Sequence, residues 1–194
     1  MRIGLFGGSF DPPHAGHIEV SLVALHRLRL DQVWWLVSPH NPLKPNAPSA
    51  DLSRRIAAAR ALARIPQIKV TGVEASLATT YTADTLCHIL PRLAGVDYVW
   101  MMGADNLAGF HRWRDWRAIA ASLPIAVFNR PGAALAALSS PAASALRRFR
   151  RDPRDAARLA QSRPPAWVFL PSPNVAISST ALRADPAKSG RRPS

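Results

Sequence analysis

Three glycines, an aspartate and two histidines lie between residues 7 and 17, and their types suit the binding of a phosphate. The segment reads Gly-Gly-Ser-Phe-Asp-Pro-Pro-His-Ala-Gly-His, directly after an apolar run over residues 3–6. Gly7 and Gly8 let the backbone turn sharply and approach a ligand that a Cβ would keep away. His14 and His17, three positions apart, share a face in the first turn of a helix. Each imidazole can donate a hydrogen bond to a phosphate whose negative charge grows during transfer.

The junction that carries these residues is expected to be a strand followed by a helix. Asp11 and Pro12 are compatible with the N-cap and the first position of that helix, whose N-terminal N–H groups and dipole favour an anion. Gly16 leaves room for a flat base or a ribose. The pattern is neither Gly-x-Gly-x-x-Gly nor a Walker loop. A zinc site is the chemical alternative, but histidines three apart with no following glutamate do not fit its usual spacings.

A second group of hydroxyls lies near the C-terminus and predicts another anion site. Ser178, Ser179 and Thr180 follow Pro173 and Asn174 and are good residues for a helix start. Arg183 comes one helical turn later, close enough to reach the same anion. A plain helix cap is the alternative, and the first phosphate segment makes the binding interpretation the better one.

The middle of the chain contains residues that could bind an aromatic nucleotide. Gly103 and Asp105 follow the apolar run 98–102, and the Asp105 carboxylate could accept hydrogen bonds from a ribose diol. Trp113 offers a large flat face on which an electron-poor ring could stack. The alternative is that Trp113 and Trp116 form the buried stripe of a helix, and we expect this more for Trp116 than for Trp113.

Two further segments could contact the same ligand. Tyr81, Thr82 and Ala83 begin a helical segment whose first N–H groups could receive a carboxylate, although Thr82 could equally be an ordinary N-cap. Asn41 and Lys44 lie in the polar loop after the apolar run 33–37 and could hold a phosphate.

Apolar runs of strand length alternate with helical segments along the chain. Strands are expected at 3–6, 33–37, 68–73, 98–102, 125–128 and 167–170, and helices at 14–30, 52–65, 82–93, 113–123 and around 145–159. This alternation predicts an α/β fold, Rossmann-like and doubly wound, with a mostly parallel sheet. Ligands then bind beyond the carboxyl ends of the strands, where the strand order reverses. We expect one domain over residues 1–183 and a disordered tail over 184–194.

The composition indicates the class of partner but does not identify a single one. The chain has 194 residues and a formal net charge of +13, which suggests phosphate-bearing partners such as nucleotides, nucleic acid or anionic lipid. No apolar run approaches the roughly 20 residues of a membrane span. The single cysteine, Cys87, agrees with a reducing compartment, so we expect a soluble cytoplasmic protein. The arginine-rich segment 147–158 contains only one aromatic residue, Phe149. It therefore lacks the aromatic side chains on which a single-stranded nucleic acid would stack.

The first segment resembles the signature of the nucleotidyltransferase superfamily that uses a His-x-Gly-His motif, and the last resembles its second signature, Ser-Ser/Thr-x-x-Arg. The central segments resemble the pattern of the bacterial nicotinate-mononucleotide adenylyltransferases, with Tyr-Thr-x-x-Thr-Leu, Gly-x-Asp-x-Leu and a tryptophan eight positions after the aspartate. The likeness covers nearly the whole chain up to Arg183. Family members usually continue into a further helical tail, whereas this sequence stops a few residues later.

The resemblance assigns roles to the residues singled out above. It implies that His14, His17 and Arg183 act on the ATP phosphates, with Gly7, Gly8, Ser9, Phe10, Gly16, Ser178, Ser179 and Thr180 around the nucleotide. Gly103 and Asp105 would face the adenosine side. Trp113 would stack on the nicotinate ring, and the backbone near Ala83 and Arg114 would bind its carboxylate. Asn41, Lys44, Tyr81 and Thr82 complete the expected acceptor site.

The reaction implied is transfer of AMP from ATP to nicotinate mononucleotide, which gives deamido-NAD and pyrophosphate in NAD biosynthesis. Mg²⁺ is expected to be held mainly by the ATP phosphates and water, so no protein ligand to a metal is expected. The amide mononucleotide and phosphopantetheine remain as alternative acceptors. A catalytically impaired relative that binds nucleic acid is the alternative from a different class, and no membrane partner is expected.

Overall fold

The structure is a computed structural model that describes residues 1–39, 51–79, 81–92, 95–129 and 131–171. Its six strands form one sheet in the order β3-β2-β1-β4-β5-β6, and every neighbouring pair is parallel. The strands are β1 (Arg2–Gly8), β2 (Gln32–Val37), β3 (Ile68–Thr71), β4 (Asp97–Gly103), β5 (Ile125–Phe128) and β6 (Trp167–Leu170). The expected doubly wound α/β fold is confirmed, and the strand order reverses between β1 and β4.

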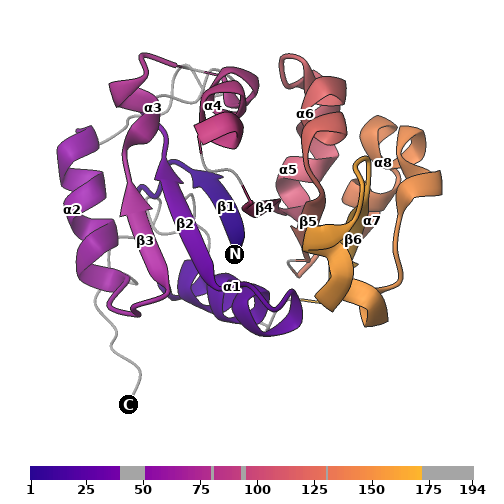
Figure 1. Cartoon of the computed structure of the whole chain (residues 1–194), viewed down its shortest axis with the longest axis horizontal. Coiled ribbons are helices and arrows are strands. Elements are labelled where there is room, and N and C mark those ends of the chain that lie inside the picture. The colour runs from indigo at the N-terminus through magenta and orange to yellow at the C-terminus, as the bar shows by residue number, and fades with distance from the viewer. Residues whose placement is uncertain (40–50, 80, 93–94, 130, 172–194) are drawn as a thin grey trace.

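Helices cover both faces of this sheet (Figure 1). They are α1 (Ala15–Arg27), α2 (Leu52–Leu62), α3 (Val73–Ser76), α4 (Thr82–Ile89), α5 (Ala104–Gly109), α6 (Trp116–Ser122), α7 (Ala134–Leu138) and α8 (Pro141–Ala145). Four short 3₁₀ segments complete them: η1 (Leu90–Arg92), η2 (Phe110–Arg112), η3 (Arg147–Phe149) and η4 (Pro153–Gln161). Within the described ranges, no helix has the length and apolarity that a membrane crossing requires.

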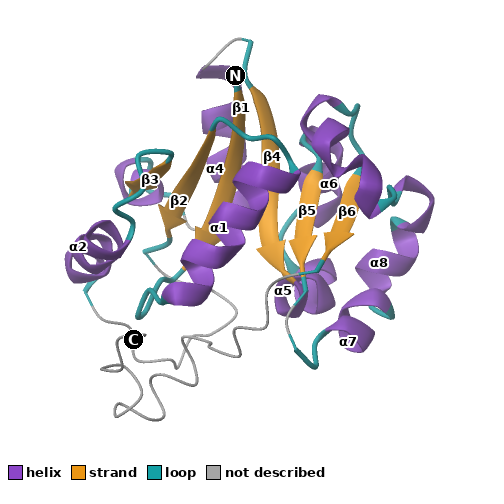
Figure 2. Ribbon diagram, turned by 90° about the horizontal axis from the view of Figure 1, so that it is seen from below, coloured by secondary structure: helices purple, strands orange, loops and turns teal. Residues whose placement is uncertain are grey.

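Two apolar cores lie on the two faces because strand side chains alternate between them. On one face, Phe6 and Val33 of the strands pack with Val20 and Ala24 of α1. On the other, Leu5 and Trp100 pack with residues of α4, α5, α6 and α8. Figure 2 shows α1 in front of the sheet and the arrowheads of β4, β5 and β6 pointing toward α5.

The start of α1 corrects one expectation. The N-cap is His14, with extended backbone, and the helix begins at Ala15, so Asp11 and Pro12 are not its cap and first residue. The reason is the second proline, because Pro13 disfavours helical backbone at the residue before it. The shift places His14 just outside the helix and His17 in its first turn.

Three other expected helices differ from the observed ones. The helix expected from Trp113 begins only at Trp116, after Asp115 takes left-handed backbone with φ of 53°. The helix expected over 82–93 ends at Ile89 and continues as η1, as Pro91 requires. The helix expected around 145–159 is absent: the Arg151 N–H donates to the Trp167 carbonyl at 2.7 Å, which ties the chain to β6. Pro153 then starts the separate segment η4.

Candidate active site

The histidine pair lies just beyond the carboxyl end of β1, beside the point where the strand order reverses. His14 and His17 are both buried, and their ring centroids are 3.9 Å apart. The backbone N–H of His14 donates to Nδ1 of His17 at 3.1 Å. Because Nδ1 accepts this bond, a neutral His17 ring carries its proton on Nε2. The two rings lie side by side as expected, although His14 is the N-cap of α1 and not a residue of its first turn. A neutral His17 ring would donate through Nε2.

Aromatic side chains fix the His17 ring. Phe10 packs against it with centroids 4.7 Å apart, and Trp35 of β2 stacks on Phe10 at 4.9 Å and 17°. The Trp35 indole N–H donates to Ser21 Oγ at 2.8 Å, and Ser21 Oγ donates in turn to the His17 carbonyl at 2.8 Å. Phe10 has φ of 46°, a left-handed conformation that costs an L residue roughly 1–2 kcal/mol. Packing of its ring between Trp35 and His17 offsets that cost.

Gly7 connects this junction to the next strand. A Cβ at Gly7 would lie 2.7 Å from the Trp100 ring of β4, so only glycine fits beside that side chain. Trp100 is 1% exposed, and Trp113 meets it edge to face with centroids 6.3 Å apart. Gly7, Trp100 and Trp113 therefore form a continuous contact from the end of β1 to the segment after β4.

Substitution of Gly7 by alanine should consequently lower stability. The new Cβ forces Trp100 to move, together with the Trp113 ring that packs on it, which we expect to cost about 1–3 kcal/mol of stability. Thermal unfolding would measure the effect. Gly8→Ala is the graded control, because its Cβ would lie 3.3 Å from the Phe10 ring and should destabilise less. Equal Tm values for wild type and Gly7→Ala would contradict the argument.

Trp113 and Trp116 occupy different environments, as expected. Trp116 is 8% exposed and belongs to the apolar core, whereas Trp113 is only partly buried against that core. Phe110 packs edge to face on both, with centroids 5.4 Å from Trp113 and 5.7 Å from Trp116. Trp113 is thus a firmly supported ring with a partly exposed surface. Gly103 ends β4, and Asp105 is exposed in the first turn of α5 on the same side of the sheet.

The start of α4 lies against Arg114. The helix begins at Thr82, and its N-cap is Tyr81, whose side chain makes no cap hydrogen bond. Thr82 is therefore not the N-cap, which removes that alternative. The Arg114 guanidinium lies 4.4 Å above the Tyr81 ring and donates to the Asp84 carboxylate at 2.8 Å. These contacts bring the segments containing Thr82, Ala83 and Trp113 together at one end of the sheet.

Two buried charged residues at this end of the sheet were not predicted from sequence. Arg55 of α2 is 3% exposed and Glu74 of α3 is 4% exposed. Burial lowers the pKa of Arg55, which the charges of Asp11 and Asp51 oppose. Burial raises the pKa of Glu74 to about 7, and a hydrogen bond with the Ser38 side chain opposes that rise. Neither residue belongs to a recognisable motif.

Glu74 predicts a pH dependence of stability. Below its ordinary pKa of 4.5 the carboxyl is protonated in the folded and unfolded chains alike and costs nothing. Between pH 4.5 and about 7 the carboxyl is ionised in the unfolded chain but still protonated in the folded one. The free energy of unfolding therefore falls by about 3 kcal/mol over this range and does not fall further above it. Glu74→Gln should therefore raise Tm at about pH 8 and leave it unchanged near pH 4.5. A Tm gain of equal size at both pH values would exclude this origin.

Several expected site residues lie outside the described residues. They are Asn41 and Lys44 of the loop after β2, and Ser178, Ser179, Thr180 and Arg183 of the second signature. The expected domain boundary at 183 and the tail 184–194 lie there as well. The other expected features lie at the carboxyl ends of the strands. The histidine pair follows β1, Trp113 follows β4, and the start of α4 follows β3 and α3.

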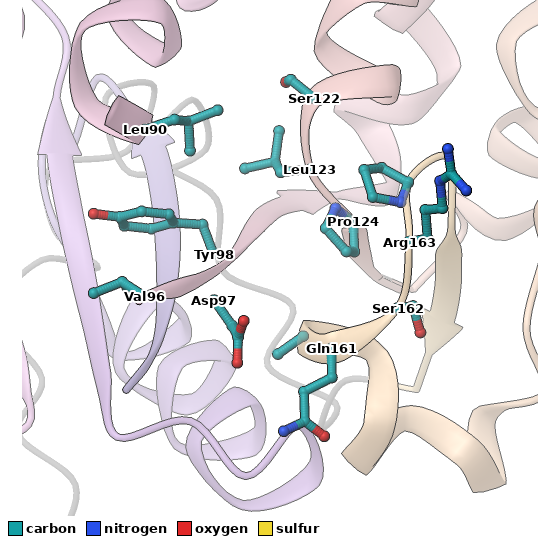
Figure 3. A pocket seen from close by; sticks show the side chains of 12 residues that line it. Leu90, Val96, Asp97, Tyr98, Ser122, Leu123, Pro124, Gln161, Ser162 and Arg163 are labelled. Atoms are coloured by element: carbon teal, nitrogen blue, oxygen red, sulfur yellow. The ribbon is translucent and has the colours of Figure 1, made fainter. Parts of the chain in front are cut away.

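A cavity of about 360 Å³ lies at the opposite end of the strands. It is lined by Asp97 and Tyr98 at the start of β4, Pro124 before β5, and Gln161, Ser162 and Arg163 at and after the end of η4 (Figure 3). In a parallel sheet the amino ends of the strands lie far from the carboxyl ends, where the histidines are. This cavity is therefore separate from the candidate site.

A family model and curated relatives both match nearly the whole chain. The cytidylyltransferase-like family model matches residues 5–185. A Cereibacter sphaeroides protein named probable nicotinate-nucleotide adenylyltransferase is 56% identical over 95% of this chain and 97% of its own. A Rhizobium meliloti protein with the same name is 55% identical over 98% of this chain and 100% of its own.

Solved structures share the fold. A Plasmodium falciparum nicotinic acid mononucleotide adenylyltransferase, complexed with NaAD, superposes with a TM-score of 0.67 at 15% identity. The superposition covers 94% of this chain and 82% of that one. A likeness at this identity shows a shared fold, which agrees with the doubly wound strand order.

Proposed function

The chain belongs to the cytidylyltransferase-like family and, within it, to the nicotinate-nucleotide adenylyltransferases, and from this premise we propose how its residues divide the reaction. The reaction is transfer of AMP from ATP to nicotinate mononucleotide, which releases pyrophosphate and gives deamido-NAD. ATP would bind at the junction after β1, and the mononucleotide at the segment after β4 and the start of α4. The observation that carries this division is the continuous contact of Gly7, Trp100 and Trp113 across the reversal of strand order.

We place the ATP site at the segment between β1 and α1. His17 would donate from Nε2 to the α-phosphate, because Nδ1 is already engaged by the His14 backbone. His14, with its ring 3.9 Å away, would contact the bridging and leaving phosphates. Gly7, Gly8, Ser9 and Phe10 would line the nucleotide, with Gly16 beneath it, while Gly103 and Asp105 contact the adenosine. We propose that Ser178, Ser179, Thr180 and Arg183 hold the β- and γ-phosphates.

We place the acceptor site between the flat ring of Trp113 and the N-terminus of α4. The nicotinate ring would stack on Trp113, and its carboxylate would accept hydrogen bonds from backbone N–H groups near Ala83 and Arg114. The contacts of Arg114 with Tyr81 and Asp84 hold these two segments at a fixed separation. Tyr81 and Thr82 would border the carboxylate, and Asn41 and Lys44 would bind the phosphate of the mononucleotide.

The chemistry requires no nucleophilic side chain. An ionised oxygen of the mononucleotide phosphate attacks the α-phosphorus in line, and the bond from that phosphorus to the β-phosphate oxygen breaks. The residues position both phosphates and stabilise the charge that develops on the transferring group. Within the described residues no three His, Cys, Asp or Glu side chains gather as a metal site. We propose that Mg²⁺ would be held mainly by the ATP phosphates and water, where it would neutralise phosphate charge.

The product identifies the reaction. Purified protein with ATP, Mg²⁺ and nicotinate mononucleotide should give deamido-NAD and pyrophosphate in equal amounts, and a chelator should abolish both. Formation of AMP instead of the dinucleotide would show hydrolysis and contradict the proposal. We place the reaction in the cytoplasm, where ATP and the mononucleotide are both available.

A further inference from the structure

Arg55 is a buried cation on a helix that otherwise presents mostly exposed residues. It lies in the first turn of α2 and is 3% exposed. Helix α2 lies beside β3 at the edge of the sheet (Figure 1). Nη1 donates to the Ser9 carbonyl at 2.7 Å and to the Ser38 carbonyl at 2.7 Å. Nη2 donates to the Pro39 carbonyl at 3.0 Å.

The three carbonyls belong to two different loops. Ser9 lies between β1 and α1, in the loop that leads to His14. Ser38 and Pro39 follow β2 and lead into the loop that we assign to the acceptor phosphate. A guanidinium is a planar fork with donors in fixed directions, so it holds its acceptors at a set separation. A lysine ammonium has donors on a single atom and cannot span the same three carbonyls.

Polar contacts continue from the second loop toward α4. The Ser38 side chain hydrogen-bonds Glu74, and the Thr79 backbone N–H donates to the Glu74 carbonyl at 3.0 Å. Thr79 and Thr85 share a hydrogen bond of 3.0 Å between their hydroxyls, and the Thr85 backbone N–H donates to the Tyr81 carbonyl at 3.2 Å. The loop that Arg55 holds is thus connected to the helix start at which we place the nicotinate carboxylate.

We propose that Arg55 is a positioning residue that sets the separation between the ATP-phosphate loop and the acceptor loop. The inference rests on the proposed function, because the two loops carry the two reacting phosphates. In-line transfer needs those phosphates near attack distance, and a misplacement of about 1 Å can cost roughly 10²-fold in rate. Arg55 touches neither substrate and acts through the loop backbones.

The test compares Arg55→Lys with Arg60→Lys, an exposed arginine on the same helix. We expect kcat of Arg55→Lys to fall by about 10- to 100-fold. The dissociation constants of ATP and of the mononucleotide, each measured alone, should change by less than about threefold, since each loop still binds its own ligand. Backbone amides of residues 7–11 and 36–38 should exchange faster in Arg55→Lys, and Arg60→Lys should match wild type in every measurement.

Each outcome decides the question. A kcat equal to wild type, or unchanged exchange in either loop, would overturn the inference while leaving the proposed function intact. A fall in both affinities equal to the fall in kcat, or failure of both Arg55→Lys and Arg55→Gln to fold, would show a purely structural role and also overturn it. Absence of turnover in wild type and Arg60→Lys alike would overturn the proposed function, and the inference with it.

Discussion

Replacement of His17 by alanine is expected to lower kcat by about 10²-fold or more, the scale of losing one donor to a transition state. The ring is oriented before substrate arrives, because the His14 N–H engages Nδ1 and Phe10 and Trp35 hold the ring plane. A donor fixed in this way stabilises developing charge without reorganisation. Since the bond tightens in the transition state, kcat should fall more than the affinity for ATP.

Two controls separate chemistry from folding in that experiment. His26→Ala changes an exposed histidine in the last turn of the same helix and should retain wild-type kcat. Because the His17 ring packs on Phe10, its loss will also lower stability, so rates must be expressed per folded molecule. Near-normal turnover by folded His17→Ala would remove His17 from the reaction.

Replacement of Trp113 by alanine is expected to raise the KM for nicotinate mononucleotide by roughly 5- to 150-fold, the equivalent of about 1–3 kcal/mol of stacking. The effect should fall on the acceptor, because Trp113 lies after β4 and its contact toward the end of β1 runs through the Trp100 ring. The KM for ATP should change by less than about twofold, since the ATP site keeps its own residues. Steady-state kinetics with each substrate varied in turn would measure both values.

Trp113→Phe is the matched variant for this prediction. Phenylalanine keeps a flat apolar ring but has less area, so it should recover most of the affinity lost by alanine. An unchanged KM for the mononucleotide in Trp113→Ala would move the acceptor site elsewhere. An equal rise in both KM values would indicate that the change disturbs Trp100 and the end of β1 rather than a stacking surface.

The local patterns of the sequence were the most predictable part of the site. The glycines and histidines of the first loop lie within a few residues of one another, so their spacing alone predicted a strand-to-helix junction with both imidazoles on one side. The helix expected from about residue 14 begins at Ala15, but its N-cap is His14 and not Asp11, because Pro13 restricts the backbone of Pro12 despite the cap preference of aspartate.

Contacts between distant residues could not be predicted in the same way. Arg55 binds a carbonyl 46 positions away and another 17 positions away, and nothing in its own helix distinguishes it from the exposed Arg54 and Arg60. Arg114 meets Asp84 across 30 positions, and the buried Glu74 hydrogen-bonds the side chain of Ser38, which follows β2. Asp115 has left-handed backbone, so α6 begins after it and Trp113 lies outside the helix. The sequence does not predict this conformation, because the position is not a glycine.

The central claim is most directly tested by pyrophosphate release from ATP and Mg²⁺ with three acceptors in turn: nicotinate mononucleotide, its amide and phosphopantetheine. We predict a kcat/KM for the acid well above that for the amide, because a carboxylate at the start of α4 gains charge-assisted hydrogen bonds that a neutral amide does not. Turnover with phosphopantetheine alone would contradict the acceptor site while keeping the ATP site. Absence of turnover with all three, together with salt-dependent binding of oligonucleotides, would contradict the account as a whole.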